Sequence, residues 1–141
     1  MNVDVNYLAV VVGAVVIFVL GWLWYGPFFG KKWIALSKFT PEEVAAGRNK
    51  GMKKQLLFTL LGALITSYVL WHAIAYATGF LQQSGLWCGV SAGFWAWLGF
   101  VFPGSMSRVL WEGRDRMLVT IDSGYYLASL VLVGGILASW M

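Results

Sequence analysis

Four long apolar segments alternate with shorter polar ones along this chain. The apolar segments cover about residues 7–25, 56–78, 86–107 and 117–140. A helix needs about 20 apolar residues to cross the hydrocarbon core of a bilayer, and each segment has roughly that length. The pattern therefore predicts an all-α integral membrane protein, a small bundle of four transmembrane helices forming one domain over residues 1–141.

The composition favours a membrane protein over a soluble one. Hydrophobic residues make up 60% of the chain and charged residues 11%, whereas soluble domains carry about 25% charged residues. The polar loops, about residues 26–55 and 108–116, are too short to hold a soluble catalytic domain. We therefore expect the lipid bilayer and other membrane helices as partners.

All ten basic residues fall within the two polar loops. Seven lie between Lys31 and Lys54, and three lie between Arg108 and Arg116. Basic loops stay on the cytoplasmic side of a membrane, so both termini are expected on the non-cytoplasmic side. This topology explains the net charge of +4, and no nucleic-acid partner is expected. The stretch Met1–Asn6 has no basic residue, so the first segment is expected to remain as a transmembrane helix rather than a cleaved signal.

The first polar loop contains a helix start and an amphipathic stretch. Thr40, Pro41 and Glu43 have the spacing of a capping box with proline at the first helical position, which predicts a short helix. In Lys31–Phe39, apolar side chains interleave with lysines. That stretch suits a segment lying on the membrane surface, and an ordinary ordered loop fits it equally well.

Small residues recur at helical spacing in the last two spans. Gly85, Gly89 and Gly93 follow one another every four residues, and the last span contains Gly124 and Ala128. Small residues let two helices approach closely in lipid. We predict helix-packing faces at these positions, and the partner helix is either in the same chain or in another one.

One carboxylate is expected at membrane depth. Asp122 lies near the start of the last span, and its candidate partner is Arg108, which follows Pro103 where the third span ends. A charge inside a membrane is costly and has a partner or a function. Asp122 is therefore either a proton or cation site, or half of a structural pair with Arg108.

His72 is the only histidine, and it lies in the second span. A single histidine with no cysteine or carboxylate nearby in sequence does not form a metal site. It is a weak candidate for an axial ligand of a haem or pigment, and a hydrogen bond inside the bundle is the simpler interpretation. No cofactor and no metal is expected.

Several short stretches resemble a known family. They are the segment 24–33 (WYGPFFGKKW), the segment 100–103 (FVFP), the segment 110–114 (LWEGR) and the segment 121–126 (IDSGYY). Together they resemble the bacterial membrane family called domain of unknown function 1761. The resemblance implies a four-span bundle in a bacterial inner (cytoplasmic) membrane and transfers no activity. In that family's pattern Asn often stands where this chain has Asp122.

These observations favour a non-enzymatic protein, a packing or accessory subunit of a homo-oligomer or a larger membrane complex. The sequence offers no catalytic constellation, and an intramembrane enzyme is the least favoured class. The alternative is a small transporter or channel for protons, ions or a small solute, with Asp122 and His72 on its path. A channel needs a polar route through the bilayer, and polar residues are sparse in the middle of the spans.

Overall fold

The computed structural model describes residues 3–141, apart from the side chain of Arg48. Its regular elements in these residues are all helical, and four of the helices are long and apolar enough to cross a membrane. These four spans are Tyr7–Phe28, Lys53–Leu81, Leu86–Leu110 and Arg116–Ala138. The all-α class and the four spanning helices are thus confirmed, and the first three spans are a few residues longer than the sequence predicts.

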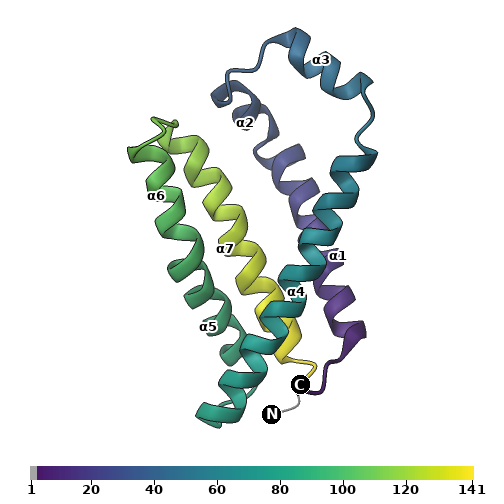
Figure 1. Cartoon of the computed structure of the whole chain (residues 1–141), viewed down its shortest axis with the longest axis vertical. Helices are drawn as coiled ribbons and strands as arrows, with labels where there is room; N and C mark the ends of the chain where they lie inside the picture. Colours follow the sequence, from purple (N-terminus) through teal and green to yellow (C-terminus); the bar gives the residue numbers. More distant parts are fainter. Residues whose placement is uncertain (1–2) are drawn as a thin grey trace.

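One π-helix ends the first span and another interrupts the third, and two short helices lie in the first loop. In chain order, labelled as in Figure 1, the elements are α1 (Tyr7–Leu23), η1 (Trp24–Phe28), α2 (Gly30–Leu36), α3 (Pro41–Asn49), α4 (Lys53–Leu81), α5 (Leu86–Ala96), η2 (Trp97–Val101), α6 (Phe102–Leu110) and α7 (Arg116–Ala138).

Helix α7 is the central element of the bundle. It is the most buried of the four spans, with α5 and α6 along one side of it and α1 and α4 on the other (Figure 1). One end of the bundle carries α2, α3 and the α6–α7 turn, and the opposite end carries both termini and the α4–α5 turn. Because all ten basic residues belong to the first of these ends, we call it the basic end.

A fully buried part of the core lies where α1, α4 and α7 meet, toward the end that carries both termini, which we call the terminal end. Ile74, Val133 and Leu137 are fully buried there. Gly13 of α1 makes the approach possible, because a Cβ at this position would collide with the Ser67 hydroxyl of α4 and crowd Val133 of α7. Close contact through small residues is the usual way in which helices associate in lipid.

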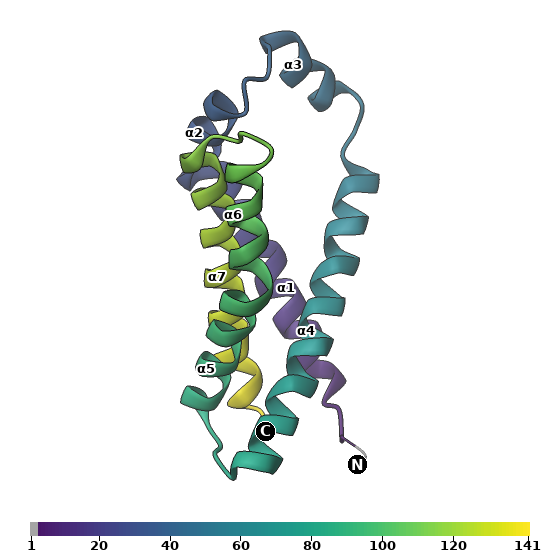
Figure 2. The same ribbon diagram turned by 60° about the vertical axis from the view of Figure 1, so that its left-hand side comes forward.

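Toward the basic end, α4 leaves the bundle. Every residue from Gly51 to Gly62 is exposed, and a Cβ added at Gly62 would meet no atom within 4 Å. Figure 2 shows this end of α4 standing apart from α6 and α7. A span that is exposed on all sides over three turns has only lipid, or another protein, to pack against.

The short helix α3 begins as the sequence predicts. Thr40 Oγ1 accepts a hydrogen bond from the Glu43 N–H at 3.2 Å, and the Thr40 N–H donates to Glu43 Oε2 at 2.8 Å. Pro41 occupies the first turn, where its missing N–H is not needed. The capping box is therefore confirmed.

Candidate functional site

The main polar centre inside the bundle surrounds three consecutive residues of α7, Ile121, Asp122 and Ser123. Two tryptophans donate indole N–H groups to the backbone on either side of the carboxylate. Trp24 Nε1 lies 3.0 Å from the Ile121 carbonyl, and Trp97 Nε1 lies 2.9 Å from the Ser123 carbonyl and 3.1 Å from its hydroxyl. Each indole therefore finds a partner at membrane depth and fixes α7 to a neighbouring span.

Each of these tryptophans begins a π-helix. In η1 the Phe29 N–H donates to the Trp24 carbonyl, five residues back, at 2.8 Å, and Pro27 has no N–H to continue an α-helical ladder. The wider turn changes the direction in which successive side chains point, and such segments are frequent at functional sites. In η1 it directs the neighbouring residues Trp24 and Tyr25 toward the same helix, α7.

Two aromatic side chains, one in η1 and one in α2, donate hydrogen bonds to the Asp122 carboxylate. Tyr25 Oη and Trp33 Nε1 each lie 2.9 Å from Asp122 Oδ1. The Tyr25 and Trp33 rings meet edge to face, with centroids 5.7 Å apart. Hydrogen bonds to a charged acceptor are about twice as strong as neutral ones, so this half-buried carboxylate ties α2 and η1 to α7.

The expected partner of Asp122, Arg108, is not engaged with it. Within the described residues the two form no ion pair, and Arg108 is exposed. Both line a cavity of 220 Å³ together with Ser105, Ser123 and Tyr126. The predicted ion pair between Asp122 and Arg108 is therefore wrong, and Tyr25 and Trp33 instead donate to one oxygen of the carboxylate, Oδ1.

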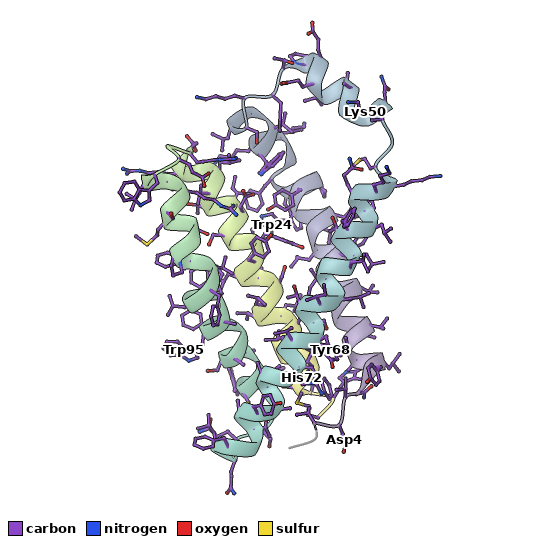
Figure 3. The ribbon with its side chains drawn as sticks, viewed as in Figure 1. Asp4, Trp24, Lys50, Tyr68, His72 and Trp95 are labelled. Atoms are coloured by element: carbon purple, nitrogen blue, oxygen red, sulfur yellow. The ribbon has the colours of Figure 1, made fainter. Side chains whose placement is uncertain are left out.

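Sequence reasoning missed the residues that build this centre. Trp24 and Tyr25 have the pattern of an interfacial aromatic belt, and Trp33 that of a surface-lying segment. The structure turns all three inward, and Figure 3 shows Trp24 among the helices. The one available signal is the Gly26–Pro27 pair, which disturbs the helix directly after Tyr25.

The predicted helix-packing residues have three different surroundings. A Cβ at Gly89 would collide with the Gly134 carbonyl, and one at Gly93 with the Leu130 carbonyl. These two glycines therefore pack against α7 of the same chain. Gly85 does not pack at all, because it stands in the turn before α5 with φ +92° and no atom within 4 Å of an added Cβ.

The small residues of α7 face a different neighbour. A Cβ at Gly124 would lie 3.3 Å from the Trp24 ring, so a larger residue there would displace the indole. Ala128, one turn further, lines an apolar hollow of 660 Å³ between α5 and α7. This face of α7 is thus covered by the Trp24 ring at Gly124 and borders the hollow at Ala128.

His72 lies away from the Asp122 centre. It sits on α4 toward the terminal end (Figure 3), with its ring 4.5 Å from the Tyr68 ring and 6.4 Å from the Tyr76 ring. His72 Nδ1 lies 3.0 Å from the Tyr68 carbonyl. Across residues 3–141, no three His, Cys, Asp or Glu side chains come close enough to hold a metal.

The four spanning helices define a multi-pass helical membrane protein. The chain belongs to the family described as protein of unknown function (DUF1761), whose model matches residues 8–138. No curated protein and no solved structure matches the chain.

Proposed function

We propose that this protein is a non-enzymatic packing or accessory subunit of a homo-oligomer or a larger membrane complex. The observation that carries the proposal is the free end of α4, Lys53–Gly62, which no other part of the described chain covers. Three aliphatic and aromatic side chains there, Leu57, Phe58 and Leu61, are 57%, 72% and 45% exposed. A transmembrane helix of a partner would cover the free end of α4 and fill the space beside it.

The polar centre supports a structural role for Asp122. Its Oδ1 atom accepts hydrogen bonds that attach α2 to α7, so the carboxylate holds the first loop against the bundle. A transporter needs a continuous polar route. Deeper in the membrane, the buried hydroxyls of Ser67 and Ser129 have no hydrogen-bond partner among the described residues. They are isolated polar groups and do not extend the Asp122 centre into such a route.

Cysteine cross-linking tests the proposal directly. In a Cys88→Ala background, we expect Leu57→Cys labelled with a benzophenone maleimide to be photo-cross-linked to another protein in native membranes. The matched control is Val15→Cys on α1, which is similarly exposed at 48%. An adduct with a second copy or with a different protein, formed at Leu57→Cys only, supports the proposal. Equal yields at both positions, or none at either, would contradict it.

The second candidate is a small transporter or channel for protons, ions or a small solute. It is favoured by the cavity of 220 Å³, because Asp122, Arg108 and two serines line it. This function predicts a flux in proteoliposomes that Asp122→Asn abolishes without loss of stability. We expect no flux with either protein, since Asp122 acts through its hydrogen bonds.

A further inference from the structure

We propose that the groove between α6 and α7 binds an anionic phospholipid from the leaflet at the basic end. One acyl chain would lie along the groove, and the headgroup phosphate would meet Arg116. The groove has a volume of 490 Å³ and runs past Met106 and Val109 on α6, and past Val119 and Leu127 on α7. It is separate from the free end of α4 and does not depend on the proposed function.

The groove exists because the third span does not follow α7 along its whole length. In α5, Gly89 and Gly93 bring the two backbones into contact. The π-helix η2 and then Pro103 interrupt this packing, and such interruptions are common causes of helix kinks. Beyond them, α6 leaves an apolar groove along α7, and Trp97, which donates to Ser123, forms part of its wall.

The length of the groove matches one leaflet. From Arg116 to Leu127 the lining follows α7, which at 1.5 Å per residue is roughly 16 Å. Half of a hydrocarbon core is about 15 Å thick. The groove therefore extends from the membrane surface to about the midplane, as a single acyl chain does.

Charge at the mouth of the groove selects the headgroup. Arg116 lines the mouth and makes no ion pair in the described part of the chain. Its neighbours are already engaged, because Asp115 accepts from the Met117 and Leu118 N–H groups and Glu112 pairs with Arg114 at 3.4 Å. The groove has no acidic residue in its lining. A guanidinium without an ion-pair partner can donate two hydrogen bonds to the oxygens of one phosphate group. Basic sites beside transmembrane helices favour anionic lipids.

Lipid titration of the purified protein, followed by native mass spectrometry, tests this site. We expect phosphatidylglycerol to bind about five- to tenfold more tightly than phosphatidylcholine with the same acyl chains, as one basic residue near the surface predicts. Arg116→Gln should remove that preference. Arg114→Gln is the matched control, because it removes an equal charge outside the groove, and it should retain the preference.

Two further outcomes make the test complete. Val109→Trp places a large ring in the groove and should weaken the binding of both lipids equally. If Val109→Trp fails to fold, Arg116→Gln still provides the test, because Arg116 is exposed. Equal binding of the two lipids by the unchanged protein would overturn the proposal. So would equal losses of preference in Arg114→Gln and Arg116→Gln, which would indicate a diffuse surface charge.

Discussion

At the scale of single residues, Asp122 holds the first loop to the bundle. Its two donors, Tyr25 and Trp33, are separated from it by 97 and 89 residues in the sequence. A contact of that range depends on how η1 turns the chain, which no local pattern reveals. From the sequence the carboxylate is recognisable as costly, but the partner assigned to it is Arg108 instead of two aromatic donors.

The hydrogen bond between Trp33 and Asp122 is expected to stabilise the fold measurably. Trp33→Phe should lower the free energy of unfolding by about 1–3 kcal/mol, because it leaves a charged acceptor with one donor fewer. Thermal unfolding in detergent measures this, with Trp95→Phe as the control, since Trp95 is 63% exposed and points away from the bundle (Figure 3).

A double-mutant cycle separates this bond from general loss of packing. Trp33→Phe and Asp122→Asn should be non-additive by at least about 0.5 kcal/mol, as residues in direct contact are. Arg108→Gln combined with Asp122→Asn should show a smaller coupling, because the two side chains share a cavity but form no ion pair. A larger coupling of Asp122 with Arg108 than with Trp33 would mean that Arg108 is the true partner.

At the scale of elements, what is local was predictable and what depends on packing was not. The lengths of the apolar segments predict the four spans, and the Thr40–Glu43 spacing predicts the start of α3. The repeat of Gly85, Gly89 and Gly93 looks uniform in sequence, yet the first of these residues forms a turn and the other two touch α7. Spacing alone cannot show that the helix begins only at Leu86.

The contact between α5 and α7 predicts opposite effects of one substitution at two glycines. Gly93→Ala should destabilise the protein by about 1–3 kcal/mol, because its Cβ would collide with the Leu130 backbone. Gly62→Ala is the matched control in α4, where nothing lies within 4 Å, and it should stabilise the protein by up to about 1 kcal/mol. Melting temperatures of the two variants report both signs. Equal shifts in the same direction would show that α5 and α7 do not touch there.

At the scale of the whole molecule, charge and shape agree on a single orientation. The first loop and the α6–α7 turn lie at one end of the bundle (Figure 1), and together they carry every basic residue. By the rule that basic loops face the cytoplasm, we propose that the basic end is cytoplasmic and that both termini are on the other side. The sequence predicts this arrangement because it depends only on charge and on the number of spans.

Membrane-impermeant thiol labelling tests this orientation. In a Cys88→Ala background, Lys50→Cys should react only after the membrane is opened, and Gln82→Cys should react in intact cells. Labelling of both from the same side would rule out the four-span topology, since Lys50 and Gln82 lie at the two ends of α4.

The central claim is that the free end of α4, Lys53–Gly62, packs against a partner. Its most direct test is the mass of particles extracted from native membranes into nanodiscs without detergent. We predict a particle whose protein mass exceeds that of one chain, either a multiple of it or its sum with another membrane protein. A particle containing one chain and lipid alone, under conditions that preserve other membrane complexes, would contradict the claim.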